Sequence, residues 1–239
     1  MKLIGLIGGT GWVSTIEYYR IMNEEVNRRL GGLQSAKCVL YSFNYAVIHE
    51  LNESYDAERQ GALMVDAAKK LVSIGAEGIV LCANTLHQFA ERVEKEIPVP
   101  LIHVSVATAM QIKKQNFRTV GLLATKYTME MDFYKRKLNE ANIQVLIPDA
   151  EEREFIHHTI THELLKGVLK EESKARFLEI MNHLHSRGAQ GIILGCTEIP
   201  LLVKQHDTEL PLFDTLSIHA LAAVDFALEN DSRTGQDKP

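Results

Sequence analysis

The sequence predicts an α/β protein of two similar lobes, each a parallel sheet covered by helices. Short apolar segments alternate with segments of helical periodicity, which is typical of parallel sheets. Strands covered on both faces are apolar along their whole length. In chain order these strands are "KLIGLIGG", "KCVLYSF", "EGIVLCA", "PLIHV", "TVGLLAT", "IQVLIP", "QGIILGC" and "PLFDT". Helical periodicity is clear at 16–30, 57–74 and 129–141, with a last helix at about 217–229.

The chain also repeats itself, which predicts two lobes of one design. Three blocks of the first half match three blocks of the second half in the same order. The pairs are "GAEGIVLCANT" (75–85) with "GAQGIILGCTE" (188–198), "VPLIHVSVATA" (99–109) with "LPLFDTLSIHA" (210–220), and 4–24 with 120–140.

We therefore expect a first lobe at 1–105, completed by about 215–230, and a second lobe at 106–214. A flexible tail is expected at 231–239, where the sequence is polar. Ligands of open α/β sheets bind outside the carboxyl ends of the strands. Two lobes that face each other would thus place an active site in the cleft between them.

Composition excludes several classes of partner. The 239 residues are 46% hydrophobic and 24% charged, as in soluble globular proteins. The net charge is −5 and no stretch is strongly basic, so we expect no nucleic-acid partner. The apolar runs are too short for a spanning helix and no signal peptide is evident. Three cysteines fit a reducing cytoplasm, and we expect a cytoplasmic protein without membrane contact.

The stretch "LGCTEIP" (194–200) connects a predicted strand to a predicted helix, and Cys196 lies in this connection. We call such a strand-to-helix connection an elbow. The backbone N–H groups and dipole at a helix N-terminus favour a thiolate, so we expect the pKa of Cys196 to be lowered. A thiolate can act as a nucleophile or as a proton acceptor. Thr197 adds a hydroxyl, and the Glu198 carboxylate is close enough to orient the thiol. A buried structural cysteine is the alternative.

The first half has its own elbow of this kind, "LCANTLH" (81–87). Asn84 and Thr85 supply donors at a helix N-terminus, where a carboxylate can bind. His87 lies one turn further, as a proton carrier or as a helix-surface residue. In the ungapped alignment Ala83 falls on Cys196, and Cys82 is one residue out of register. Its side chain should therefore point the other way, and we interpret it as structural.

The glycine-rich stretch "GLIGGTGWVST" (5–15) contains neither GxGxxG nor a GK[ST] ending, so it does not predict a nucleotide site. Thr10 in this loop and Thr125 in its counterpart "GLLATKYT" (121–128) are expected substrate contacts. The histidines around 157–162 lack the spacing of a metal-binding motif, and we expect no metal.

With these motifs in view, the chain resembles the aspartate/glutamate racemase family over almost its full length. It is most similar to a bacterial subgroup described as L-aspartate/glutamate-specific or broad-specificity amino-acid racemases. The motifs that carry the resemblance are "IGLIGGTGWVST", "CANTLH", "GLLATKYTME" and "GCTEIPLL".

The resemblance implies an amino-acid substrate, no pyridoxal phosphate or other cofactor, no metal and a homodimer. It implies two residues on opposite faces of the substrate Cα, one removing a proton and the other returning one. The family's second cysteine corresponds to Cys196. Its CNT motif corresponds to Asn84 and Thr85, which would hold the α-carboxylate together with Thr197.

The sequence departs from the family at the first cysteine, whose place is taken by Ala83, and alanine has no proton to exchange. The bare sequence leaves open whether this alanine is natural or engineered. The stretches "FNYAVIHEL" and "HELLKGVL" show no matching arginine for a distal carboxylate, and Lys166 is offset by about one position. The sequence therefore does not single out aspartate as the substrate.

Three functions fit these residues. The first is a racemase with Cys196 as acid/base and Glu198 as its partner, while a water, Thr85 or His87 serves the other face. Such an enzyme could be slow or one-directional. The second is a one-thiol decarboxylase of the same fold, similar to arylmalonate decarboxylases. The third is a non-catalytic protein that binds a small acid.

Overall fold

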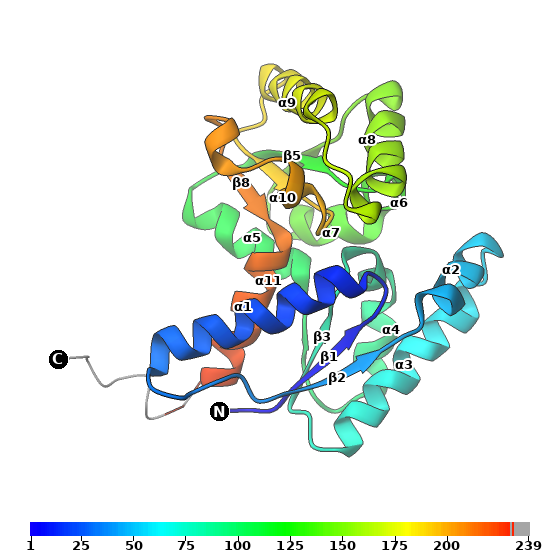
Figure 1. The fold of residues 1–239 in the computed structure, drawn as a ribbon, viewed down its shortest axis with the longest axis vertical. Coiled ribbons are helices and arrows are strands. Elements are labelled where there is room, and N and C mark those ends of the chain that lie inside the picture. The colour runs from blue at the N-terminus through cyan, green and yellow to red at the C-terminus, as the bar shows by residue number, and fades with distance from the viewer. Residues whose placement is uncertain (230, 232–239) are drawn as a thin grey trace. The chain divides into compact units, whose positions relative to one another are not determined.

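The computed structural model describes residues 1–229 and 231, which form two compact units (Figure 1). The first unit comprises Met1–His103 and the described residues from His219 onward, and the second comprises Val104–Ile218. The tail predicted to be flexible, 231–239, lies outside the described residues except for Asp231.

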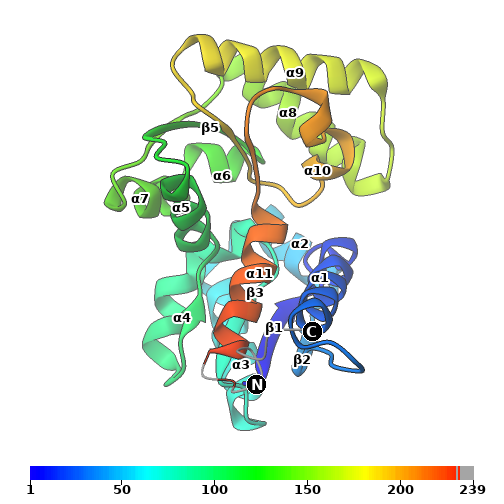
Figure 2. The same cartoon turned by 90° about the vertical axis from the view of Figure 1, so that its left-hand side faces the viewer.

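The first unit, over its described residues, is built on a four-stranded parallel sheet with the order β2-β1-β3-β4. Its strands are β1 (Ile4–Gly8), β2 (Cys38–Ser42), β3 (Gly78–Leu81) and β4 (Leu101–Ile102). Its helices are α1 (Trp12–Leu30), α2 (Tyr45–Glu53), α3 (Ala57–Ser73), the 3-10 helix η1 (Asn84–Phe89), α4 (Ala90–Glu96) and most of α11 (Thr215–Leu228) (Figure 2).

The second unit repeats this topology, with a four-stranded parallel sheet of order β6-β5-β7-β8 within residues 104–218. Its strands are β5 (Thr119–Leu123), β6 (Gln144–Leu146), β7 (Ile192–Leu194) and β8 (Leu212–Asp214). Its helices are α5 (Val104–Lys114), α6 (Lys126–Glu130), α7 (Asp132–Glu140), α8 (Ala150–His162), η2 (Leu164–Lys166), α9 (Glu171–Ser186), α10 (Ile199–Leu202) and η3 (Gln205–Asp207).

The backbone places the two elbows at equivalent points of the two sheets. After β3, the N–H of Cys82 donates to the carbonyl of Ile7 in β1 at 2.8 Å. After β7, the N–H of Gly195 donates to the carbonyl of Leu123 in β5 at 2.7 Å. The next residue in each unit is Ala83 or Cys196, as in the ungapped alignment of the sequence.

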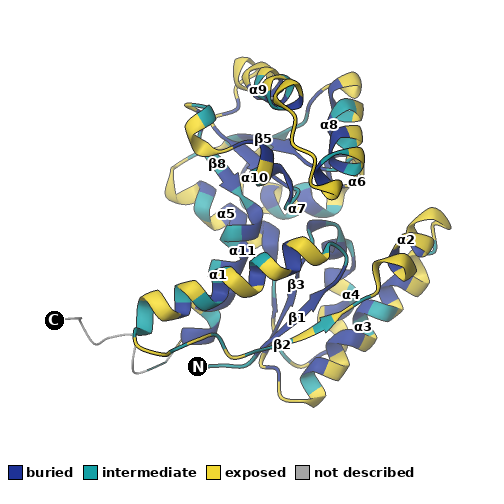
Figure 3. Cartoon of the chain, viewed as in Figure 1, coloured by how far each residue is buried: buried dark blue, intermediate teal, exposed yellow. Residues whose placement is uncertain are grey.

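Each unit has its own apolar core, seen as dark blue central strands in Figure 3. All residues of β1 and β3 are buried, which explains why these strands are apolar without alternation. Tyr18 in α1 and its repeat partner Tyr134 in α7 are both fully buried. The shared residues of the repeat therefore include core positions, which specify the packing of a helix on its sheet.

The structure differs from the sequence prediction at several element boundaries. The helix predicted over 129–141 is two helices, because Met131 adopts an extended conformation between α6 and α7. The strand predicted at "PLIHV" covers only Leu101–Ile102, because α5 begins at Val104. Within the described residues, no helix combines the length and the apolar character that crossing a bilayer would require.

Candidate active site

The elbow of the second unit begins with a glycine that the packing requires. A Cβ on Gly195 would lie 2.8 Å from Leu122 Cδ1 and 3.0 Å from Ala124 Cβ, both on the neighbouring β5 side of the sheet. Contacts this short force a shift of neighbouring atoms. This close approach lies where the chain leaves β7 and enters the polar segment Cys196–Glu198. Helix α10 follows, with Pro200 in its first turn.

The side chains of this segment meet at one carboxylate oxygen. The Cys196 thiol donates to Glu198 Oε2 at 3.0 Å, and the Thr197 hydroxyl donates to the same oxygen at 2.8 Å. Glu198 is only 6% exposed, whereas Cys196 is partly exposed. Both donors are therefore ordered by one buried acceptor.

The predicted lowering of the Cys196 pKa is wrong. Burial, followed by the negative charge and the hydrogen bond of Glu198, raises the pKa of the thiol well above its usual range. The backbone N–H groups of Glu198 and Thr197 do favour the thiolate, but their contribution is smaller. The helix that follows has only four residues, too few for a strong dipole. Cys196 is therefore a protonated thiol at neutral pH.

The elbow of the first unit offers no such group at the equivalent residue. Ala83 is extended (φ −149°, ψ 140°) and immediately precedes η1. Asn84 at the start of this helix is buried, and the next residue, Thr85, is partly exposed. Cys82 is 1% exposed, and burial raises the pKa of its thiol, as a structural cysteine requires.

His87 is not a helix-surface residue, because it is 3% exposed and its Nδ1 lies 3.1 Å from the carbonyl oxygen of Ala83. Its ring packs against two further buried histidines, with centroid distances of 4.7 Å to His103 and 5.3 Å to His219. None of the sequence motifs indicates either of these partners. They belong to the repeat blocks "PLIHV" and "LSIHA", but their separation along the chain hides the contact.

The predicted substrate contacts near the first strands have mixed surroundings. The Thr10 hydroxyl oxygen is buried and has no hydrogen-bond partner among residues 1–229 and 231. Thr125 is the N-cap residue of α6 but makes no side-chain capping hydrogen bond to its backbone, and its Oγ1 lies 3.3 Å from Thr128 Oγ1. In the glycine-rich loop, Gly9 has φ 83° and donates to Thr15 Oγ1 at 3.1 Å, so this loop is closed by its own side chain.

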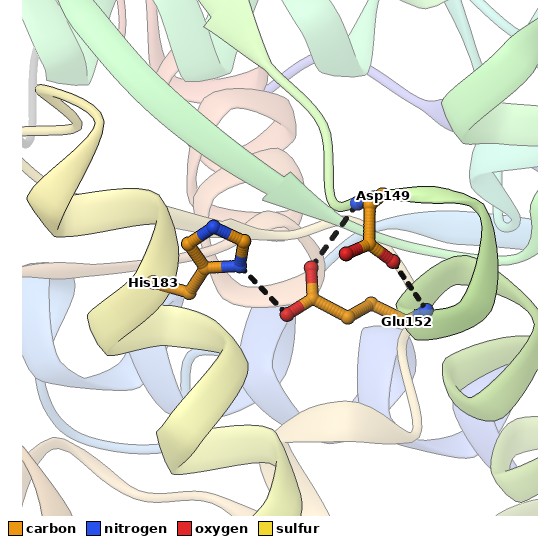
Figure 4. Close-up of side chains that lie close together, drawn as sticks. All are labelled: Asp149, Glu152 and His183. Carbon is orange, nitrogen blue, oxygen red and sulfur yellow. Dashed lines mark hydrogen bonds and ion pairs between the residues drawn. The ribbon is translucent and has the colours of Figure 1, made fainter.

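Asp149, Glu152 and His183 form a cluster whose chemistry could suit a metal ion (Figure 4). Their hydrogen bonds show another role. Asp149 Oδ1 accepts the N–H of Glu152, and Glu152 Oε2 accepts the N–H of Asp149, which is a capping box at the start of α8. Glu152 Oε1 lies 2.8 Å from His183 Nδ1 on α9. The cluster therefore caps one helix and ties it to another, and the absence of a metal site stays a prediction.

Lys166, considered above as a possible partner of a distal carboxylate, ends η2 and is exposed. The described residues thus bring Cys196, Thr197 and Glu198 together in the second unit. In the first unit, Ala83, Asn84 and Thr85 are consecutive at the start of η1. Their roles toward a substrate stay predictions.

Each of the two α/β units has a parallel sheet of the same topology and a polar elbow at the carboxyl end of its third strand. This is the fold class predicted above. The chain belongs to the Asp/Glu/hydantoin racemase family, whose profile matches residues 7–223. The chain is thus a member of a family of racemases, which are isomerases. The family and the fold class expected from the sequence are both confirmed.

Solved structures and curated proteins support this membership. A protein assigned as an Asp/Glu racemase from Yersinia pestis superposes with a TM-score of 0.91 and 45% identity, covering 95% of this chain and 100% of that one. An aspartate racemase homologue from Pyrococcus horikoshii OT3 gives a TM-score of 0.84 and 36% identity, covering 95% and 99%.

Two curated racemases are more distant in sequence. The broad specificity amino-acid racemase RacX of Bacillus subtilis is 21% identical over 228 residues, covering 93% of this chain and 96% of that protein. The glutamate racemase of Aquifex pyrophilus is 31% identical over 150 residues, which span 59% of this chain and 54% of that enzyme.

Proposed function

We propose that the protein is an amino-acid racemase of the aspartate/glutamate type that exchanges the Cα proton without a cofactor, with Cys196 as an acid/base group. The observation that supports this most directly is the Cys196 thiol at the end of β7, hydrogen-bonded to the buried Glu198. A thiol with a proton to give, beside a group that can orient it, is what protonation of a carbanion requires.

In this proposal the α-carboxylate of the amino acid is bound by Asn84, Thr85 and Thr197, with Thr10 and Thr125 as further contacts. These groups supply hydrogen bonds to the carboxylate, where negative charge accumulates when the Cα proton leaves. A carbanion next to a carboxylate is the unstable species of the reaction. Donors fixed at helix starts can stabilise it without reorganising.

Cys196 gives its S–H proton to one face of Cα, so that the electron pair of the carbanion forms the new C–H bond. The thiolate left behind is stabilised by the backbone N–H groups of Thr197 and Glu198, which favour the charged form. In the reverse direction the thiolate removes the same proton. Glu198 orients the sulfur and, by its charge, keeps the proton on it until the carbanion forms.

A second candidate function is supported by Ala83, which carries no exchangeable proton at the equivalent place of the first unit. A decarboxylase of this fold needs only one thiol, because loss of CO₂ generates the carbanion and a single proton completes the product. A protein that binds a small acid without turnover needs neither group. These two functions are distinguished from racemisation by proton exchange.

The test is α-proton exchange in D₂O, followed by NMR, with both enantiomers of aspartate and glutamate and with Cys196→Ser as the control. Exchange or inversion that is lost in the control supports the proposal. Lack of exchange with every amino acid tested would contradict it and leave the decarboxylase, which is assayed by CO₂ release from a disubstituted malonate.

A further inference from the structure

The first unit leaves one edge of its sheet open, along strand β2. Within residues 1–229 and 231, β2 pairs with β1 on one side and has no strand on its other side. The Lys37 carbonyl accepts the N–H of Ile4, and the Phe43 N–H donates to β1. The odd-numbered residues of this segment therefore face β1. The N–H and C=O groups of the even-numbered residues point outward, from Cys38, Leu40 and Ser42.

The open edge exposes an apolar side chain on the face of the sheet that α1 covers. Leu40 is paired with Leu6 of β1, so the two side chains lie on the same face. Gly8, two residues further along β1, identifies this face, because a Cβ there would lie 2.5 Å from Thr15 Cγ2 in α1. Leu6 is fully buried, whereas Leu40 is 47% exposed. The apolar surface of this face thus continues to the outer edge.

Helix α1 presents an apolar row on the flank nearest to this edge. Trp12, Ile16 and Tyr19 follow the spacing of one helix face and are 66%, 53% and 56% exposed. The same row continues to Asn23, whose Oδ1 accepts the N–H of Ala36 at 3.0 Å. Ala36 lies two residues before the start of β2, so this flank of α1 lies on the β2 side of the sheet.

The chain itself covers the C-terminal half of the row. Asn27 donates to the carbonyls of Gly32 and Gln34, in the segment between α1 and β2, at 2.8 and 3.2 Å. On the other flank of the helix, Arg29 pairs with Asp225 of α11 at 2.6 Å. The N-terminal half of the row remains exposed beside an open strand edge. Such an edge is a template for pairing with a further strand.

We propose that a second copy of the chain binds here, edge to edge about a two-fold axis. The edge surface is defined as the outer edge of β2 together with Trp12, Ile16, Tyr19 and Leu40. Two β2 strands pair antiparallel with Leu40 opposite its own copy and Cys38 opposite Ser42. Every outward N–H and C=O of the three residues then has a partner. The exposed row of α1 lies on the same face and extends the contact to the partner's α1.

Charge and area both favour a second copy as the partner. The outward residues of β2 and the exposed part of the row carry no charge, so self-pairing brings no like charges together. The four apolar side chains of the edge surface, each about half to two-thirds exposed, offer on the order of 400 Å². A standard interface buries about 800 Å² per partner, of which about 60% is non-polar. The edge surface thus supplies most of the apolar area that a stable dimer needs.

The test is the oligomeric state of the full chain, measured by sedimentation velocity over micromolar concentrations. The parent protein should sediment as a dimer. Leu40→Lys should weaken dimerisation by at least about 100-fold, because two lysines would face each other at the two-fold axis. Ile16→Glu, in the row of α1, should weaken it by at least about 10-fold. Ile74→Lys is the matched control, since it changes a 59% exposed residue at the end of α3 and should leave the dimer intact.

A mixing experiment tests the two-fold register. Leu40→Glu should also be monomeric by itself, for the same reason as Leu40→Lys. An equimolar mixture of the two variants should form a heterodimer, because the lysine of one chain then faces the glutamate of the other. Circular dichroism that matches the parent protein shows that each variant is folded, as expected for a half-exposed position.

The outcomes are distinct. A monomeric parent protein would overturn the proposal and leave the edge surface to a different kind of partner. A dimer that tolerates Leu40→Lys or Ile16→Glu would place the interface elsewhere and overturn it too, and a mixture that stays monomeric would overturn the two-fold pairing of β2. Sedimentation does not depend on turnover, so each result is independent of the proposed function.

Discussion

The two elbows share a backbone and differ in chemistry. Cys82 and Gly195 make the same hydrogen bond to the first strand of their sheets, at 2.8 and 2.7 Å. The residue that follows is Ala83 in one unit and Cys196 in the other. The second unit carries a thiol at this residue, whereas the first carries a methyl group there and packs three buried histidines, His87, His103 and His219, against one another. The repeat thus preserves the backbone of the elbow without preserving the side chain that follows it.

The largest expected effect is the loss of the thiol from the second elbow. Cys196→Ala should reduce α-proton exchange and inversion by about 10²–10⁴, because no other group at that residue can donate a proton. The measurement is NMR-detected exchange in D₂O. Cys82→Ala is the matched control, since it removes a buried thiol that holds the preceding position of the other elbow, and it should leave exchange unchanged.

Making the elbows alike should have the opposite effect. Ala83→Cys places a thiol at the equivalent point of the first unit and should raise the inversion rate by up to about 10²–10⁴, the usual contribution of a positioned acid/base group. Ala83→Val is the control, because it adds volume without a proton. An inversion rate that does not change in Ala83→Cys would show that residue 83 is not in reach of the substrate.

The buried His219 makes the first unit sensitive to acid. Burial lowers the pKa of His219 from 6.5 to about 4, so between these values the unfolded chain binds a proton that the native state excludes. The contribution of neutral His219 to the free energy of unfolding is therefore fully present above pH 6.5. It is lost as the pH decreases toward 4, by about 3 kcal/mol for a shift of this size. Urea unfolding at pH 7.5, 5.5 and 4, followed by circular dichroism and by the fluorescence of Trp12 in α1, measures it.

His219→Gln should flatten this dependence, because glutamine does not titrate. The substitution keeps a donor for the Ile102 carbonyl, so the loss of stability at pH 7.5 should be small compared with the acid effect. A first-unit transition that stays as acid-sensitive as in the parent protein would show that other groups, His87 among them, bind the protons.

Much of the scaffold could be predicted from the sequence, because its signals are local. The apolar strands β3 and β7 lie where the repeat blocks predict them, and the contact between Cys196 and Glu198 joins residues only two apart. The break at Met131 has no comparable signal in the residue pattern. It depends on how α6 and α7 pack.

The errors at the site arise because the interactions responsible for them are not local in the sequence. The sequence predicts a lowered pKa for Cys196 from the following helix, but burial and the Glu198 charge have the larger effect, and both are tertiary properties. The ring contacts of His87 with His103 and His219 join three separate segments of the chain, so no spacing rule could find them. The contact of a thiol with a nearby carboxylate can be predicted locally, whereas the protonation of the thiol depends on its surroundings in the fold.

The carboxylate at the second elbow provides the next comparison. Glu198→Gln keeps the shape of the acceptor but removes the charge that raises the pKa of Cys196. The thiol pKa should fall, so alkylation by iodoacetamide at pH 7.5 should become faster. Turnover should decrease by about 10- to 100-fold, corresponding to about 1.5–3 kcal/mol for a hydrogen bond to a charged group. Slower alkylation would contradict the electrostatic role assigned to Glu198.

The smallest expected effect concerns the residue before Cys196 in the second elbow and the residue before Ala83 in the first. Gly195→Ala should destabilise the second unit by about 1–3 kcal/mol, because the new Cβ would lie 2.8 Å from Leu122 Cδ1 and 3.2 Å from the Leu123 carbonyl oxygen. The first unit accommodates a side chain at the equivalent position, where Cys82 is fully buried. Urea unfolding of Gly195→Ala beside Cys82→Ala measures the difference. A stability of Gly195→Ala equal to that of the parent protein would mean that the second elbow can relax around a side chain, and that glycine is not what fixes the place of Cys196.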